Sequence, residues 1–189
     1  MCPLRPYWEP VGLRKAVQRP ITGLTDISEK RDYGMRLTVY SDYALRLMMY
    51  LGLNVGKLAT ISEVSEAYGV SKAHLMKITH ELGKKGLIET VRGRHGGMRL
   101  GQDARSIKVG DIVRACEPDF AIVPCMEQGA VLVCTIQPAC VLKRALSSAT
   151  EAFLNALDEF TLADLLKPSA PLRQLLGIVP ASTTAQLHG

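Results

Sequence analysis

The stretch from residue 60 to residue 101 constrains the fold of this chain most, because it joins two short helical patterns to a glycine-rich hairpin. Thr60-Ile-Ser-Glu63 matches a capping box and predicts the start of a first helix. Tyr68-Gly69-Val70 predicts a tight turn, after which Ser71 is expected to cap a second helix that runs to about Lys85. Two short helices joined by a glycine-containing turn indicate a helix-turn-helix.

The second of these helices has one apolar face. Leu75, Ile78 and Leu82 recur at helical spacing and are expected to face inward. In a helix-turn-helix the second helix enters the major groove of DNA, and its N-terminal residues reach the base edges. The side chains of this helix that we expect to contact DNA are those of Ser71, Lys72, His74 and Lys77.

A predicted β-hairpin follows directly. Residues 87–91 and 98–100 are typical of two short strands around a glycine-rich loop, with Arg92, Arg94 and His95 at its tip. The glycines allow the backbone to approach phosphates closely, and the arginines suit a narrow minor groove or the phosphate backbone. A hairpin of this kind after a helix-turn-helix indicates a winged helix, so we expect these three side chains to contact DNA.

Charge is distributed unevenly along the chain. Residues 71–108 hold nine lysines and arginines against three acidic residues, a net of +6, whereas residues 109–189 hold five against eight, a net of −3. A basic middle followed by an acidic C-terminal part indicates that one module binds a polyanion, here double-stranded DNA. The alternative is a basic surface that is only solvated.

Three cysteines follow the winged helix and form the candidate metal site. Cys125, Cys134 and Cys140 have the spacing C-x8-C-x5-C, and prolines and a glycine around them favour a looping backbone that can converge on one centre. Thiolates are the soft ligands that iron–sulfur clusters and zinc prefer. Zinc needs four ligands, yet no histidine lies between His95 and His188.

An iron–sulfur cluster with three thiolates and one weaker ligand fits this donor set better, and its nuclearity, 4Fe–4S or 2Fe–2S, stays undecided. Cys2 and Cys116 are poorly placed to contribute. Free buried thiols and a redox-active disulfide remain alternatives. An enzyme with Cys125 as nucleophile would need a base, and all four histidines fall in the DNA-facing segment or the tail, so we expect no enzyme.

The chain divides into regions of different character. Four prolines and no sustained periodicity mark residues 1–34, which we expect to be a disordered extension or a wrongly assigned start. The regular pattern begins at Met35, and Ser41 is the expected N-cap of a first helix that glycines 52 and 56 end. The predicted regions are a winged helix-turn-helix (35–108), a helix and cysteine loop (109–140), a dimerisation helix (141–167) and a flexible tail (168–189).

The dimerisation helix is predicted from a stripe of apolar residues. From Leu142 to Phe160 these recur at spacings of three and four over about five turns. Such a helix either covers its own core or packs against a symmetry mate, and two-fold dimers suit inverted half-sites, so we expect a homodimer. The fold class is therefore mainly α with a small β wing. No signal peptide or transmembrane pattern is visible, and the expected location is the cytoplasm.

Several of these segments in combination match a known family. The matching pieces are Met-Arg-Leu-Thr at 35–38, Ser-Asp-Tyr-Ala-Leu-Arg at 41–46, residues 70–77, residues 89–97, Glu-Pro-Asp-Phe at 117–120, the three cysteines and Thr-Leu-Ala-Asp-Leu at 161–165. From Met35 to about Leu166 the chain resembles the NsrR/IscR class of winged-helix iron–sulfur regulators. Lys143 stands where IscR-like members carry a histidine ligand, so the resemblance is to the NsrR-like members.

The resemblance implies a dimeric repressor whose three cysteines bind a cluster and which releases DNA when nitric oxide reaches that cluster. In that scheme the genes it controls serve nitric oxide detoxification. Asp42 matches the position of an aspartate that is a fourth ligand from the partner subunit in some members; a favourable charge in the first turn of a helix is the alternative role. An iron-responsive, RirA-like repressor and a cluster-free thiol redox regulator are the competing interpretations.

Overall fold

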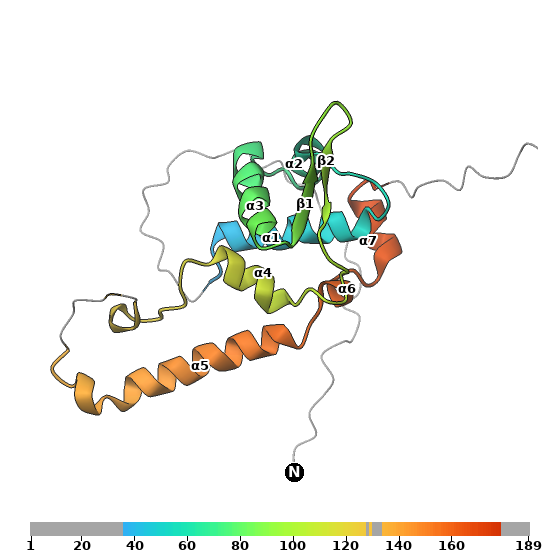
Figure 1. Cartoon of the computed structure of the whole chain (residues 1–189). Helices are drawn as coiled ribbons and strands as arrows, with labels where there is room; N and C mark the ends of the chain where they lie inside the picture. Colours follow the sequence, from blue (N-terminus) through green and yellow to red (C-terminus); the bar gives the residue numbers. More distant parts are fainter. Residues whose placement is uncertain (1–35, 128, 130–133, 179–189) are drawn as a thin grey trace, which may run out of the picture. The chain divides into compact units, whose positions relative to one another are not determined.

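The structure is a computed structural model that describes residues 36–127, 129 and 134–178. The expected extension, residues 1–34, and the last part of the predicted tail, residues 179–189, lie outside the described residues. The described part is helical with one small antiparallel sheet, which confirms the predicted fold class (Figure 1). No helix in the described ranges is long and apolar enough to cross a membrane.

Helix α1 (Val39–Leu53) runs through the centre of the winged helix. Its N-cap is Thr38, whose hydroxyl accepts a hydrogen bond from the Ser41 amide at 3.3 Å, so the prediction of Ser41 as the cap is wrong by three residues. Gly52 does not end the helix as predicted. It lies inside α1. A Cβ at this position would meet Leu166 Cδ1 at 2.6 Å, so glycine allows that leucine to pack closely against the helix.

The helix-turn-helix has the predicted form. Helix α2 (Ile61–Tyr68) begins at the Thr60–Glu63 capping box, in which both reciprocal hydrogen bonds are present. It ends at Gly69, whose φ of 66° places the backbone in the left-handed region that glycine adopts at little cost. Helix α3 (Lys72–Lys84) follows, and Ser71 occupies its N-cap position without a side-chain capping hydrogen bond.

The wing is a two-stranded antiparallel hairpin. Strand β1 (Ile88–Val91) pairs with β2 (Gly97–Leu100), and Ile88 lies opposite Leu100. Across the strands Arg99 and Glu89 form two hydrogen bonds, at 2.9 and 3.0 Å. A Cβ at Gly96 would collide with the Val91 carbonyl, so the glycine-rich turn is needed to close this hairpin.

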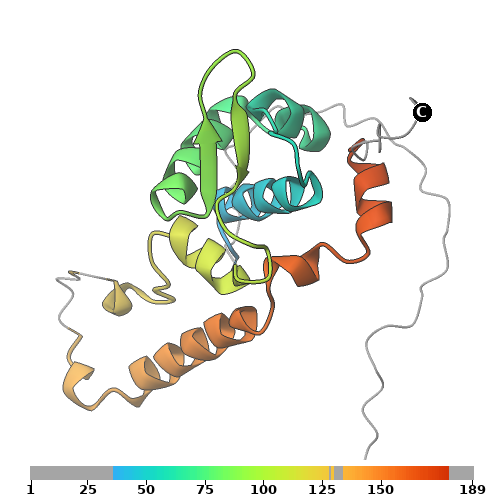
Figure 2. The same cartoon turned by 45° about the vertical axis from the view of Figure 1, so that its right-hand side comes forward.

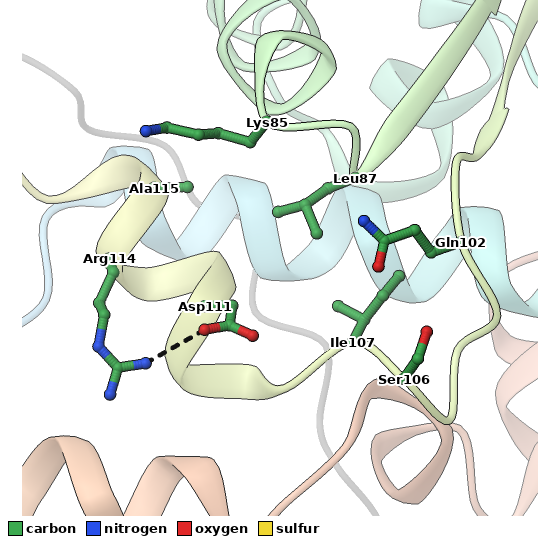
Figure 3. Close-up of a pocket in the computed structure, with 8 residues that line it drawn as sticks. All are labelled: Lys85, Leu87, Gln102, Ser106, Ile107, Asp111, Arg114 and Ala115. Atoms are coloured by element: carbon green, nitrogen blue, oxygen red, sulfur yellow. Dashed lines mark hydrogen bonds and ion pairs between the residues drawn. The ribbon is translucent and has the colours of Figure 1, made fainter.

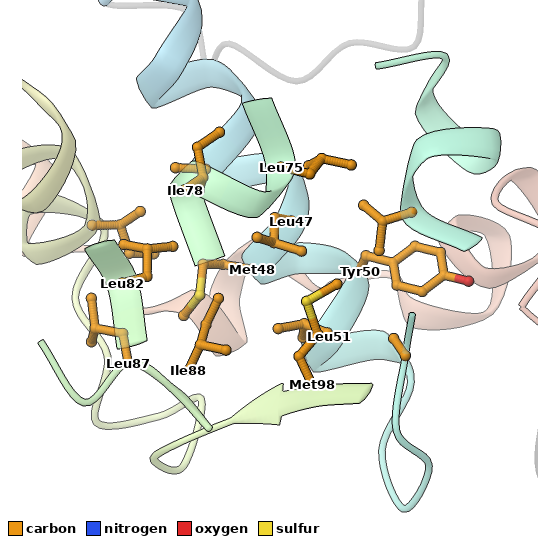
Figure 4. Packing of buried hydrophobic residues seen from close by; sticks show 14 of the residues in the cluster. Leu47, Met48, Tyr50, Leu51, Leu75, Ile78, Leu82, Leu87, Ile88 and Met98 are labelled. Atoms are coloured by element: carbon orange, nitrogen blue, oxygen red, sulfur yellow. The ribbon is translucent and has the colours of Figure 1, made fainter. Parts of the chain in front are cut away.

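One apolar core holds α1, α2, α3, the wing and helix α4 (Val109–Cys116) together. Its centre is drawn in Figure 4, where side chains of α1 and α3 meet those of the wing. The predicted inward residues Leu75, Ile78 and Leu82 are fully buried here. Side chains of this kind each contribute about 1.5–3 kcal/mol on burial, so the core fixes how α3 and the wing are presented.

The C-terminal part differs from the prediction in two places. The segment expected to form one helix over 141–167 contains α5 (Val141–Asp158) and a separate helix α6 (Leu162–Leu165), because Thr161 and Asp164 form a second capping box that starts α6. The expected flexible tail from residue 168 begins with helix α7 (Ser169–Leu175). Burial of Ile178 and a hydrogen bond from Arg173 to the last carbonyl of α1, 3.0 Å long, hold that helix in place.

Two short 3-10 helices, η1 (Pro124–Met126) and η2 (Gln137–Ala139), lie in the segment between α4 and α5. We call residues 117–140 the cysteine segment. Both views show the described parts of this segment at the far side of α4 from the wing, next to the start of α5 (Figures 1 and 2).

Candidate nucleic-acid interface and cysteine segment

The outer face of α3 carries the basic side chains predicted to contact DNA. Ser71, Lys72, His74 and Lys77 are all exposed there, opposite the buried leucines and isoleucine of the same helix. Among the residues that the structure describes, neither lysine lies within ion-pair distance of an acid. Both charges are therefore available to a polyanion.

The wing tip presents a second group of basic side chains. Arg92, Arg94 and His95 are exposed in the turn between β1 and β2, as the sequence predicted for the loop. Neither of these arginines has an acid partner in the described ranges, in contrast to Arg99, which is held by Glu89 on the strands. The free cations are thus at the tip and the paired one is on the body of the wing.

Met76 was missed by the sequence reasoning. Its side chain is 57% exposed on the outer face of α3, between Lys72 and Lys77. The 3.6-residue period that placed the three leucine and isoleucine positions inward also places residue 76 outward, so this signal was present in the sequence. An exposed thioether on such a helix is suited to apolar contact with a thymine methyl group.

Two tyrosines near the start of α1 contact side chains of α3. The rings of Tyr43 and His74 are 5.9 Å apart between centroids, and Lys77 Nζ lies 5.7 Å from the Tyr40 ring centroid. The Tyr40 hydroxyl is buried and is the one side-chain polar atom of the described residues recorded as buried without a hydrogen-bond partner. Burial, together with the nearby Cys116 and Glu81, raises the pKa of Tyr40. The start of α1 is therefore in direct contact with the candidate DNA-binding helix.

Glu117 ties the cysteine segment to the same end of α1. Its Oε1 accepts hydrogen bonds from the Thr38 amide at 2.8 Å, the Thr38 hydroxyl at 3.1 Å and the buried Ser41 hydroxyl at 2.5 Å. A carboxylate at a helix N-terminus is also favoured by the helix dipole. Sequence reasoning used this glutamate only as part of a family motif, and its partner 79 residues away could not be read from local pattern.

The four described cysteines fall into two groups. Cys116 is buried at the end of α4, where desolvation raises the pKa of its thiol to about 11. The other three are free thiols at the surface or half-buried: Cys125 in η1, Cys134 after the undescribed residues 130–133, and Cys140 as the N-cap of α5. The Cys140 sulfur accepts a hydrogen bond from the Lys143 amide at 3.4 Å.

The donor chemistry of these three thiols fits an iron–sulfur cluster, because all are free and on one segment. Within the described ranges, however, no three Cys, His, Asp or Glu side chains are gathered in a geometry that could hold a metal ion. Asp42 lies on the first turn of α1 and forms two contacts of 3.0 Å with Arg46, which occupies its carboxylate. The structure thus places the predicted ligands without bringing them together.

A cavity of about 300 Å³ lies between the end of α3, the loop after the wing and α4 (Figure 3). Leu87 and Ile107 form its apolar floor. Its polar rim is largely engaged already, since Arg114 pairs with Asp111 and Asp158 and Gln102 donates to the Gly86 carbonyl. We therefore assign it no ligand.

Comparisons with solved structures agree with this arrangement. IscR of T. potens is 27% identical, with a TM-score of 0.59 and coverage of 74% of this chain and 92% of that one. CymR, described as the global cysteine regulator of B. subtilis, is 25% identical with a TM-score of 0.57, covering 70% and 96%. CymR of Staphylococcus aureus is also 25% identical, with a TM-score of 0.54 and coverage of 69% and 97%.

A family profile described as Rrf2, iron-dependent transcriptional regulator, matches residues 37–168, which include the helix-turn-helix, the wing, the three cysteines and α5. This match confirms the predicted class of transcriptional regulator and supports the expectation that the chain is not an enzyme, while the NsrR-like subtype stays a prediction. The chain belongs to the Rrf2 family of transcriptional regulators.

Proposed function

We propose that this protein is a repressor that binds promoter DNA as a homodimer and senses nitric oxide through an iron–sulfur cluster held by Cys125, Cys134 and Cys140. The observation that carries the proposal is the tie at Glu117. It joins the cysteine segment to the end of α1 whose tyrosines contact His74 and Lys77 on α3. Glu117 precedes Cys125 by eight residues, so a rearrangement of the cysteine segment that displaces Glu117 would reach the DNA-binding face.

DNA binding rests on two exposed groups of cations. Lys72 and Lys77 on α3 suit the major groove, and Arg92 and Arg94 on the wing suit phosphates or a narrow minor groove. Ser71, whose hydroxyl caps no amide, and the exposed His74 and His95 add hydrogen-bonding groups beside them. Met76 adds an apolar contact that a thymine methyl group satisfies.

Dimerisation rests on α5. This helix of 18 residues has no buried residue, although its sequence has an apolar stripe. Leu142 is 62% exposed and Val141 is 64% exposed, while the alanines at 145, 149, 152 and 156 are exposed along one side. Small residues on one face allow a second helix to approach closely, so a second copy of α5 is the proposed partner.

The cluster supplies, when bound, iron that reacts with nitric oxide. The chain supplies the three thiolates, and its Lys143 leaves the fourth position without the histidine of IscR-like members. If Asp42 of the partner subunit takes that position, at least one of its carboxylate oxygens exchanges its contact with Arg46 for one with iron, at the first turn of α1. Glu117 holds this same turn, so a change in the turn on ligation would reach the end of α1 that contacts α3.

The direct test is an anaerobic purification followed by an absorption spectrum and operator binding. We expect a brown chromophore, tight binding by the loaded protein, and parallel loss of colour and affinity on titration with nitric oxide. Equal operator affinity of loaded and cluster-free protein would contradict the proposal. Loss of affinity on iron chelation, with no response to nitric oxide, would instead identify an iron-responsive repressor.

The coupling step has its own test in Glu117→Gln, which keeps the shape of the side chain but removes the charge that accepts three hydrogen bonds. Hydrogen bonds to a charged group contribute about 1.5–3 kcal/mol each, so this change weakens the tie substantially. We expect the variant to keep its chromophore while the ratio of operator affinities between loaded and cluster-free protein falls toward one. Asp119→Asn, on the same segment, is the matched control and should keep the wild-type ratio.

A cluster-free thiol regulator is the second candidate, and the similarity to CymR favours it. Cys134 is exposed and Cys140 is the half-buried N-cap of α5, so an oxidant can reach thiols on this segment. This candidate predicts colourless anaerobic protein and an operator affinity that changes with a thiol oxidant. The absorption spectrum therefore separates the two functions.

A further inference from the structure

Among the residues that the structure describes, hydrogen bonds join α5 to the winged helix at the C-terminal end of α5. Backbone hydrogen bonds join the two sides there: Val109 N donates to Phe160 O at 3.0 Å, and Leu162 N donates to Ile107 O at 2.8 Å. Leu162 is fully buried, whereas α5 itself has no buried residue. Both views show the rest of α5 extending beyond α4 toward the cysteine segment (Figures 1 and 2). The direction of α5 therefore depends on this junction.

A bidentate ion pair connects the last turn of α5 to α4. The Arg114 guanidinium donates to both carboxylate oxygens of Asp158, with Nη1–Oδ1 at 2.9 Å and Nη2–Oδ2 at 2.5 Å. Nη1 also reaches Asp111 at 3.3 Å, which holds the guanidinium on the α4 side. Two parallel hydrogen bonds of this type define orientation as well as distance, which a single contact does not.

Gly110 makes room for this pair. It is buried on α4, and a Cβ there would collide with Asp158 Oδ1 and meet Arg114 Nη1 at 2.8 Å. Its backbone is helical, so glycine is not required for conformation at this position. The absence of a side chain is what allows the carboxylate to reach the surface of α4.

We propose that Arg114, Asp158 and Gly110 form a clamp that sets the angle between α5 and the winged helix, and with it the separation of the two α3 helices in the dimer. Arg114 is thus a positioning residue for operator spacing. The inference rests on the proposed function, because it requires that α5 forms the dimer and that each α3 reads one half-site.

Helix α5 is long enough that a small change in its angle at the junction moves its far end by several ångströms. At 1.5 Å per residue α5 spans about 27 Å, so a change of about 10° at the junction moves its far end by about 5 Å. Half-sites of helix-turn-helix dimers lie about 34–36 Å apart over about ten base pairs, which is about 3.4 Å per base pair. If loss of the clamp lets the angle of α5 vary by about 10°, the separation of the two half-sites that the dimer can bind varies by more than one base pair.

The test uses the full-length protein and an inverted half-site that the wild type selects from random duplexes. Duplexes carry this pair at its selected spacing and with one or two base pairs added or removed, beside a duplex with a single half-site. We expect the wild type to prefer its selected spacing by about tenfold over a change of one base pair, the effect typical of a mismatched contact. Arg114→Ala should reduce this preference to about twofold while single half-site affinity and dimer mass in sedimentation stay unchanged.

Gly110→Ala reaches the same clamp from the other side and should flatten the spacing profile in the same way. Lys84→Ala removes a cation from an ion pair that lies within the last turns of α3, outside the junction, and should keep the wild-type profile. A wild-type profile in both clamp variants overturns the inference, as does a loss of spacing preference that comes only with loss of dimer mass or half-site binding. A wild type that gains nothing from a second half-site overturns the proposed dimeric repressor itself.

Discussion

The winged helix and the region after it differ in how they are held. Residues 39–116 contain almost all of the buried side chains, on α1 to α4 and the wing, whereas from residue 117 to residue 161 no described residue is buried. The first region presents DNA-facing cations on a scaffold fixed by its own core. The second carries three free thiols and an exposed helix, joined to the first at Glu117 and at the Arg114–Asp158 pair.

This difference indicates where each region obtains its stability. A segment whose described residues include no buried side chain gains little from its own contacts to offset the conformational entropy lost on ordering. In the proposed function the missing contacts come from the cluster and from the second copy of α5. A sensor assembled in this way responds to the loss of its ligand, because few contacts within its own chain stabilise its ordered form.

Replacing the thiols has the largest expected effect on this contrast. Alanine at any of Cys125, Cys134 or Cys140 should abolish the anaerobic chromophore, because each is needed to complete a three-thiolate site. Cys116→Ala should keep it, since that thiol is buried in the first region and stays protonated with a pKa of about 11. Absorption spectra and iron content after anaerobic reconstitution measure both. Loss of the chromophore in the Cys116 variant would place the sensor partly inside the core.

Truncation of one leucine in each region gives the next largest effect. Leu47 is fully buried on α1, so Leu47→Ala should lower the free energy of unfolding by about 2–5 kcal/mol. Leu142→Ala on α5 should change it by about 0.5 kcal/mol or less in dilute protein but raise the dimer dissociation constant. Urea unfolding at several protein concentrations, with sedimentation, measures both. Equal destabilisation by the two variants at every concentration would show that α5 belongs to the same core.

The wing arginines contribute a smaller and salt-dependent effect within the first region. Arg92→Ala and Arg94→Ala together should lower operator affinity and reduce the slope of log affinity against log salt by about two, about one for each lost phosphate contact. Arg105→Ala is the control, since Arg105 is already paired with Asp103. Unchanged salt dependence in the double variant would mean that the wing tip does not reach DNA.

The winged helix could largely be predicted from the sequence, whereas the region after it could be predicted only in part. The helix-turn-helix and wing follow from local signals, namely the Thr60–Glu63 capping box, Gly69 and the glycines of the hairpin, and all three act within a few residues. The predicted start of α1 was wrong because Thr38, and not Ser41, is the N-cap, and Glu117, which is 79 residues away from Thr38, holds both side chains. Such distant contacts leave no periodic trace in the sequence.

The C-terminal errors have two different causes. The end of α5 could have been predicted, because Thr161 and Asp164 have capping-box spacing, but the apolar stripe was extended through Phe160 and that signal was overlooked. Helix α7 could not, because it depends on burial of Ile178 against the winged-helix core. For the cysteines, spacing identified candidate ligands but not their geometry, which depends on groups outside the single chain in the proposed function.

Low pH should weaken the attachment of the second region to the first, and this is the smallest of the expected effects. Hydrogen bonds from the Thr161 hydroxyl and amide and from Lys167 lower the pKa of Asp164 to about 2, and those from Arg105 do the same for Asp103. Both pKa values lie below the ordinary 3.8, so the stabilisation is present above about pH 4 and is lost as the pH falls toward 2. Asp164→Asn should raise the pH of half-unfolding by a few tenths of a unit in an acid titration followed by circular dichroism, while Asp119→Asn should leave it unchanged. A variant with the wild-type acid midpoint would show that the capping box at α6 adds nothing to the attachment of the second region.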